Sequence, residues 1–326
     1  MSSAHRILIV HGHGFKPDNT TLRELTIAAL RAGIERDCGE YLAAFDSTSV
    51  QFVYYGDLNN ALLIAAGRRY DEALDVGDRR NALLALREIS ERKQFGIRRY
   101  DRLPGKSAVK EFIAACMMPI AGALGLWMWL CARRAPDAAA YLQRDPDYAV
   151  EVLARAREAL RTLLSHDGPT MLISHGTGCM PVWDALWQLS HDPAHDGGER
   201  KLDVWLTLGA PLGDRNVRRR LHGASESGLR RFPTNVMSWF NVSAEDDYVS
   251  HDDTLADDFR DMMREHAISV IRDYVIYNHA VRYGRSNPHS SVGYYIHPRV
   301  TKLLADWLQP RSAITSKEYT PLSIVE

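Results

Sequence analysis

Two glycine-rich turns carry polar side chains directly after short apolar runs of this sequence. His11-Gly12-His13-Gly14 follows residues 6–10, and His175-Gly176-Thr177-Gly178 follows residues 171–174. Glycines let backbone N–H groups approach an oxygen on which negative charge develops during a reaction. Both turns therefore favour binding of an oxyanion, although residues 11–14 alone are equally typical of a plain tight turn.

Acidic residues and a histidine stand in comparable places further along the chain. Glu245-Asp246-Asp247-Tyr248-Val249 follows the apolar residues 236–242, and Asn287-Pro288-His289-Ser290-Ser291 precedes the last helical pattern. A carboxylate can hold a histidine in the orientation that general base catalysis needs. The two segments are therefore candidates to supply such an acid and such a base.

The elements that must position these residues alternate along the chain. The predicted strands are 6–10, 50–55, 171–174, 204–208 and 236–242. The predicted helices are 21–36, 71–99, 148–165, one that follows residue 178, and 298–308. This alternation predicts an α/β protein with a doubly wound, mostly parallel sheet, in which ligands bind at the carboxyl ends of the strands. We expect one domain over 1–310, with an insertion at about 66–147 and a C-terminal tail at 311–326.

In this order, the segments resemble those of bacterial α/β-hydrolases of the lipase and esterase superfamily. The resemblance covers roughly residues 5–310 and rests on Val-His-Gly-His-Gly, Val-Tyr-Tyr-Gly-Asp, Ile-Ser-His-Gly-Thr-Gly, Trp-Leu-Thr-Leu-Gly-Ala-Pro-Leu-Gly, Trp-Phe-Asn-Val, Asp-Asp-Tyr-Val-Ser and Pro-His-Ser-Ser. It implies the α/β-hydrolase fold, with a nucleophile elbow where a strand turns into a helix. It also implies hydrolysis of a carboxylic ester with an apolar acyl group, without a cofactor.

Residue roles follow from the resemblance position by position. It implies Asp247 as the acid and His289 as the general base. The weaker matches are Asp246 for the acid and His279 or His297 for the base. The residues implied for oxyanion and substrate binding are Gly12, His13, Gly14, His175 and, through its backbone N–H, Thr177. Asp57, which follows the second strand, is a further candidate for a ligand contact.

The sequence departs from the family pattern at the nucleophile. Gly176 stands where the catalytic serine belongs, so the resemblance does not imply a serine hydrolase. The backbone of that position is strained, which costs a residue with a Cβ about 1–3 kcal/mol, whereas glycine adopts it freely. The nucleophile is then a water activated by His289, or Thr177. Ser174 and Cys179 are less well placed for this role.

An uncharged stretch, residues 112–132, is the second conspicuous feature. As a helix it would be about 30 Å long, enough to cross a bilayer. A single crossing would separate the first two strands from the others, so the predicted sheet argues against it. We expect a broken apolar cap that covers an acyl pocket or lies on a membrane surface. A buried core helix or a homodimer contact is one alternative, and a re-entrant hairpin or a true membrane span is another.

The composition limits partners and compartment. The formal net charge of −1 provides no general field to attract nucleic acid. Arg215, Arg218, Arg219 and Arg220 are expected to form a solvated helix face. The four scattered cysteines predict reduced thiols in the cytoplasm, without a disulfide framework or a metal site. The first residues lack the pattern of a signal peptide.

Two classes of function stay open. The first is hydrolysis of a small or lipid-like ester by Asp247 and His289, with water or Thr177 as nucleophile. The second is a catalytically silent protein of the same fold that binds a lipid-like ligand, a membrane surface or a protein partner through residues 112–132.

Overall fold

The centre of the molecule is a parallel β-sheet. The computed structural model describes residues 4–105, 127–191, 200–250 and 254–309. Within them, the large sheet has the strand order β2-β1-β3-β4-β5-β6, and every neighbouring pair is parallel. Its strands are β1 (Arg6–Val10), β2 (Ser49–Val53), β3 (Thr170–His175), β4 (Leu202–Leu208), β5 (Val236–Ala244) and β6 (Val270–Ile276). The predicted α/β class with a mostly parallel sheet is confirmed.

Helices connect the strands and cover both faces of the sheet. The longer ones are α1 (Asn19–Asp37), α3 (Gly56–Ala65), α4 (Glu72–Arg87), α7 (Trp127–Arg134), α8 (Pro136–Leu142), α9 (Tyr148–Leu164), α10 (Cys179–His191) and α15 (Pro298–Leu308). The shorter ones are α2 (Leu42–Asp46), α5 (Ile97–Tyr100), α11 (Arg215–Arg218), α12 (Leu255–Asp258), α13 (Arg260–Arg264) and α14 (Ser291–Tyr295). A small antiparallel pair, β7 (Val281–Arg282) and β8 (Arg285–Ser286), precedes α14.

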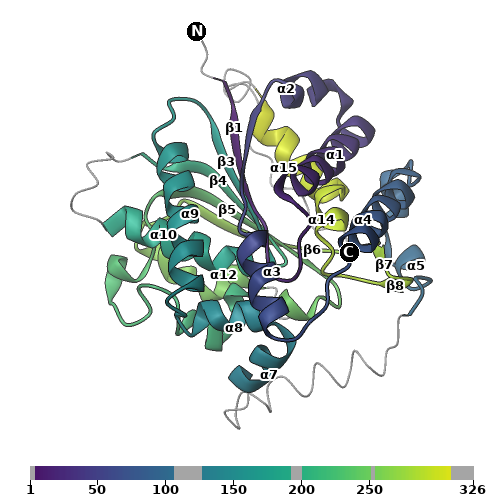
Figure 1. Cartoon of the computed structure of the whole chain (residues 1–326). Helices are drawn as coiled ribbons and strands as arrows, with labels where there is room; N and C mark the ends of the chain where they lie inside the picture. The colour runs from purple at the N-terminus through teal and green to yellow at the C-terminus, as the bar shows by residue number, and fades with distance from the viewer. Residues whose placement is uncertain (1–3, 106–126, 192–199, 251–253, 310–326) are drawn as a thin grey trace.

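The core has two layers because side chains of a strand alternate between the faces of the sheet. On β1, Leu8 and Val10 join the apolar cluster under α9 and α10, whereas Ile7 and Ile9 join the cluster under α1 and α15. Figure 1 shows α9 and α10 on one side of the sheet and α1 and α15 on the other. The inner strands β1, β3 and β4 are buried from both sides, which explains why they read as continuous apolar runs.

The chain order places a switch point between β1 and β3. From β1 the chain moves outward to β2, then returns to β3 on the opposite side of β1. Loops that leave the two strands at such a point diverge and open a crevice at their carboxyl ends. Val10 of β1 pairs with Ser174 of β3, so the two glycine-rich turns emerge side by side.

Two predictions about elements need correction. The helix predicted over 71–99 is interrupted: α4 ends at Arg87, and the helical backbone resumes only in a 3₁₀ turn at Arg92–Gln94 and in α5. Ser90 and Gly96, both weak helix formers, lie in the interruption. The strand β6 was not predicted, because its exposed Arg272 breaks the apolar pattern at the edge of the sheet.

The predicted insertion at 66–147 divides between both faces of the sheet. Its first helix, α4, packs against α1 and α14, whereas α8 packs against α3 and α9. Of the apolar stretch 112–132, residues 112–126 lie outside the described residues. The remainder begins α7, which packs on α8. No helix in the described ranges is both long and apolar enough to cross a bilayer.

Candidate active site

Asp247 and His289 form a hydrogen-bonded pair at the carboxyl edge of the sheet. Nδ1 of His289 lies 2.9 Å from Oδ2 and 3.0 Å from Oδ1 of Asp247. The Asp247 side chain is fully buried, whereas 22% of the His289 side chain is exposed. Two further groups donate to the carboxylate: the hydroxyl of Tyr294 at 2.6 Å and the backbone N–H of Val249 at 3.0 Å. The carboxylate is thus held from several sides and fixes the orientation of the imidazole.

Backbone contacts place these two residues opposite each other. Asp247 lies in the turn after β5, where its N–H bonds to the carbonyl of Ala244 at 3.1 Å. The backbone on both sides of His289 is held by Asn278, whose amide donates to the carbonyls of Pro288 and Ser290 at 2.7 and 2.9 Å. Asn278 is fully buried, which makes this clamp part of the core.

The charge of His289 and several hydrogen bonds keep Asp247 ionised. Burial alone would raise the pKa of this carboxyl. The neighbouring His289 and the hydrogen bonds from His289, Tyr294 and Val249 outweigh burial, so that the pKa lies below its usual value. A negatively charged Asp247 can stabilise an imidazolium at His289 when that ring accepts a proton.

Gly176 forms the apex of the turn between β3 and α10. Its φ of +57° is a left-handed conformation that favours glycine. A Cβ at this position would lie 2.7 Å from Nε2 of His289. That Nε2 atom is buried and has no hydrogen-bond partner among the described residues. The imidazole therefore presents its free nitrogen to a backbone position that carries no side chain.

The turn after β1 packs tightly against this apex. A Cβ on Gly12 would lie 2.8 Å from the carbonyl oxygen of His175 and 3.4 Å from the backbone nitrogen of Thr177. Only a glycine allows this approach of the two turns. The N–H of Gly14 is already used, because it donates to the Asp137 carboxylate at 2.6 Å. The predicted oxyanion segments thus meet, but Gly14 cannot contribute its N–H.

Two more histidines surround His289. The ring centroids of His175 and His13 lie 4.6 and 5.4 Å from that of His289. Burial is the main cause that lowers the pKa of both rings, to about 4 for His13. Burial and the nearby Arg79 likewise lower the pKa of Lys16 to about 7, and its ammonium contacts the carbonyls of His13 and Gly14. Burial near His289 therefore disfavours positive charge on these three side chains.

The hydroxyl and thiol groups near the apex do not reach His289. Ser174 Oγ lies 3.1 Å from Cys179 Sγ and accepts a hydrogen bond from Trp205 Nε1 at 2.9 Å, inside the core. Burial raises the pKa of the Cys179 thiol to about 12. Thr177 is half-buried, and no hydrogen bond in the described parts of the chain joins its hydroxyl to His289.

The second-choice residues lie elsewhere. Asp246 accepts a hydrogen bond from the Tyr100 hydroxyl at 3.0 Å. The ring nitrogens of His279 approach the carbonyls of Tyr277 and Gly96, at 2.8 and 3.2 Å. His297 uses Nδ1 to cap α15. Asp57 points away from the pair and forms an ion pair with Arg155 at 2.7 Å. The structure does not bring these four residues to the site.

Two cavities meet at His13. A polar cavity of about 280 Å³ is lined by His289, His175 and Lys16 together with Arg79 and Arg282. An apolar cavity of about 240 Å³ is lined by Thr177 and by residues of α7, α8 and α10, including Leu130, Ala138 and Met180. His13 lines both cavities, whereas His289 lines only the polar one and Thr177 only the apolar one.

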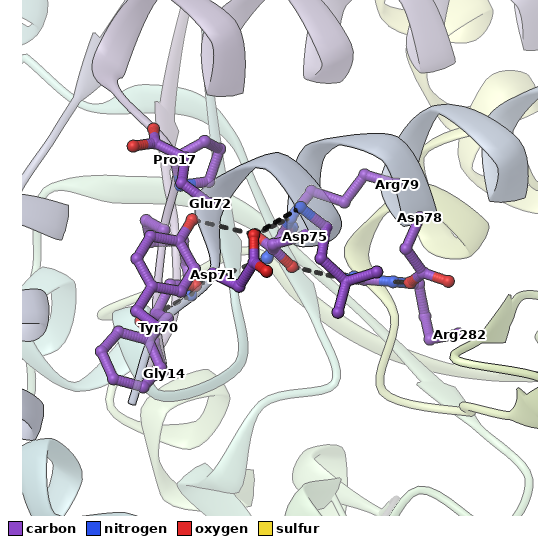
Figure 2. Close-up of polar contacts among 12 residues, drawn as sticks. Gly14, Pro17, Tyr70, Asp71, Glu72, Asp75, Asp78, Arg79 and Arg282 are labelled. Carbon is purple, nitrogen blue, oxygen red and sulfur yellow. Dashed lines mark hydrogen bonds and ion pairs between the residues drawn. The ribbon is translucent and has the colours of Figure 1, made fainter. Parts of the chain in front are cut away.

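A buried ion network forms the far wall of the polar cavity. Asp75 binds Arg79 at 2.8 Å and Arg282 at 2.6 Å, and Arg282 also contacts Asp78 (Figure 2). Hydroxyls of Tyr70 and Tyr283 complete the hydrogen bonds of Asp75. The network joins α4 to the β7–β8 pair and fixes that wall.

The residues that sequence analysis missed are those that support the pair. Tyr294, Asn278, Asp137 and Lys16 contact the site from segments without a recognisable motif. In the described ranges no group of three or more histidine, cysteine or acidic side chains has the geometry to hold a metal ion.

Comparisons of the chain with protein-family models, with curated proteins and with solved structures found no match. The chain is therefore assigned to no family.

Proposed function

We propose that the protein hydrolyses carboxylic esters, with His289 as general base, Asp247 as its supporting acid and water as the nucleophile. The observation that carries this proposal is the free Nε2 of His289, which faces Gly176 while Nδ1 is held by an ionised Asp247. A buried polar atom without a protein partner calls for a partner from outside the chain. The resemblance to lipases and esterases in the order of the segments supports the same reaction.

The chemistry needs one proton acceptor that later becomes a donor. Water attacks the ester carbonyl carbon, and Nε2 of His289 takes the proton that the water loses. The negative charge moves to the former carbonyl oxygen, and we assign the N–H groups of His13 and Thr177 to stabilise it. When the tetrahedral intermediate collapses, the bond to the alcohol oxygen breaks, and His289 returns the proton to that oxygen. Asp247 stabilises the imidazolium between the two steps.

Water is a better candidate than Thr177 for the nucleophile. Thr177 and His289 line different cavities, with His13 between them. Because the ring stands so close to Gly176, the attacking water enters only when the imidazole moves away from the apex. The apolar cavity then suits the acyl chain, and the polar cavity suits the alcohol and the water.

Hydrolysis of p-nitrophenyl esters of increasing chain length tests this proposal. We expect turnover by the wild-type protein, and a loss of about 100-fold or more in Asp247→Asn, in which the imidazole loses its anionic partner. Thr177→Val, which keeps the shape of the side chain without its hydroxyl, should keep the wild-type rate. Turnover lost in Thr177→Val would identify the threonine as nucleophile, and equal rates in Asp247→Asn and wild type would contradict the mechanism.

A catalytically silent binding protein is the second candidate, favoured by one observation. Nε2 of His289 lies where a serine side chain would stand, so the ring fills the position of the absent nucleophile. In that case the apolar cavity binds an acyl-like ligand without reaction. Binding of a fatty acid without turnover of any ester would establish this function instead.

A further inference from the structure

A cavity outside the candidate active site combines an aromatic floor with a rim of arginines. Its volume is about 310 Å³, and none of its lining residues lines the two cavities at His13. The floor consists of the buried rings of Trp183, Phe232 and Phe259, of which Trp183 and Phe259 lie 5.0 Å apart between centroids. The rim consists of Arg215, Arg218, Arg219 and Arg231.

The rim differs from the solvated helix face that the sequence predicts. Arg215, Arg218 and Arg219 line the cavity, whereas Arg220 does not, and bonds back to the carbonyl of Asn216 at 2.7 Å. The short helix α11 and the turn after it therefore place three arginines around one cavity. Arg231, from the 3₁₀ turn Gly228–Arg231, supplies the fourth.

Positive charge is in excess at this rim. Arg218 pairs with Asp258 at 2.5 Å, and Arg231 has a longer contact of 3.6 Å with Asp261. Arg215 and Arg219 form no ion pair with any carboxylate in the described ranges, and both are exposed. Four guanidinium groups thus face two carboxylates, and two of the four are available to a ligand.

From this geometry we infer that the cavity binds a small organic phosphate with a flat or apolar part, such as a nucleoside monophosphate. Guanidinium groups present paired N–H donors that match the oxygens of a phosphate. The exposed edges of the aromatic floor, together with Leu221, offer apolar contact to the rest of the ligand. His222, also in the lining, has a buried Nδ1 without a hydrogen-bond partner among the described residues and can bond to a ligand hydroxyl. The volume lies at the small end of ligand sites.

Isothermal titration of the full chain with AMP and with inorganic phosphate, at about 0.15 M salt, tests the inference. We expect AMP to bind at least about tenfold more tightly than inorganic phosphate, because only AMP reaches the aromatic floor. The double variant Arg215→Gln/Arg219→Gln should weaken AMP binding by about tenfold or more. The matched control, Arg80→Gln/Arg87→Gln, removes two exposed arginines of α4 and should bind AMP as the wild type does.

Three results would overturn the inference. The first is the absence of AMP binding to the wild-type protein. The second is an equal loss of affinity in both double variants, since it would reflect overall charge. The third is much tighter binding of a single-stranded oligonucleotide than of AMP, which would assign the rim to nucleic acid. Ester hydrolysis is independent of each result, because none of these arginines contacts the Asp247–His289 pair.

Discussion

At the scale of residues, the site depends on one glycine and one imidazole that share a small volume. Gly176 has a left-handed φ, and His289 Nε2 occupies the space that any Cβ at position 176 would need. Two separate costs therefore oppose a side chain there: backbone strain, and displacement of the imidazole. The two costs can be measured separately, because a substitution at Gly67 causes backbone strain without displacing any side chain.

Gly176→Ala should destabilise the protein more than Gly67→Ala. Gly67 has a φ of +78° and no atoms near its Cβ position, so its substitution reports backbone strain alone, about 1–2 kcal/mol. The contact with His289 should add at least about 1 kcal/mol to the cost at position 176. Denaturant unfolding measures both values. In a His289→Ala background the excess should vanish; equal costs in the wild-type background would mean that the ring does not occupy the space.

His13 should make the protein less stable as the pH falls below neutral. The pKa of the folded residue is about 4, against about 6.5 in an unfolded chain. Between these values the unfolded chain binds a proton that the folded chain does not, so the free energy of unfolding decreases with decreasing pH. From pH 7.5 to pH 5 the wild type should lose about 2 kcal/mol more than His13→Gln. Parallel pH profiles of the two proteins would show that His13 is not buried as a neutral ring.

At the scale of elements, the wall of the polar cavity is held by the ion network between α4 and the β7–β8 pair. Asp75 is the shared partner of Arg79 and Arg282, and all three side chains are more than nine-tenths buried. Loss of one partner in a buried network leaves the opposite charge without compensation.

Asp75→Asn should therefore cost about 3–5 kcal/mol of unfolding free energy. Glu151→Gln is the matched control: it removes a carboxylate from an exposed pair with Arg155, which contributes less than about 1 kcal/mol. Thermal or denaturant unfolding of the two variants gives the comparison. A cost of Asp75→Asn as small as that of Glu151→Gln would show that the network does not hold α4 in place.

The sequence predicts the elements whose burial leaves a simple pattern. The strands β1, β3 and β4 are predicted because both of their faces are covered, which requires continuous apolar runs. The edge strand β6 is not predicted, because Arg272 and Asp273 interrupt its apolar residues. The two turns at the switch point are predicted because each follows a buried strand. They lie close together because these two strands pair with each other.

The sequence does not predict what holds the site together. Tyr294 reaches Asp247, and Asp137 reaches Gly14, across 47 and 123 residues of the chain. Such contacts depend on how helices pack after the sheet forms, and no local pattern marks them. Asp57 is predicted as a ligand contact because it follows a strand of the sheet. It lies in the first turn of α3 and forms an ion pair with Arg155 of α9 instead.

At the scale of the whole molecule, the sheet brings the turns that follow β1, β3 and β5, and the segment before α14, to one edge. That edge separates a polar cavity with the free imidazole nitrogen from an apolar cavity under α7 and α8. An ester that spans both would place its carbonyl beside His13, between the two turns. The arrangement supports the proposed hydrolysis, because Asp247, His289 and the two cavities proposed for the parts of the substrate all lie around one switch point.

The rate of ester hydrolysis in two histidine variants tests the role of His289 as general base. His289→Gln keeps much of the size of the side chain but removes the proton acceptor, whereas His279→Gln changes an equally polar, buried ring outside the pair. With p-nitrophenyl octanoate as substrate, we expect a loss of about 100-fold or more for His289→Gln and a rate near that of the wild type for His279→Gln. A wild-type protein without turnover, or a His289→Gln variant as active as the wild type, would contradict this role.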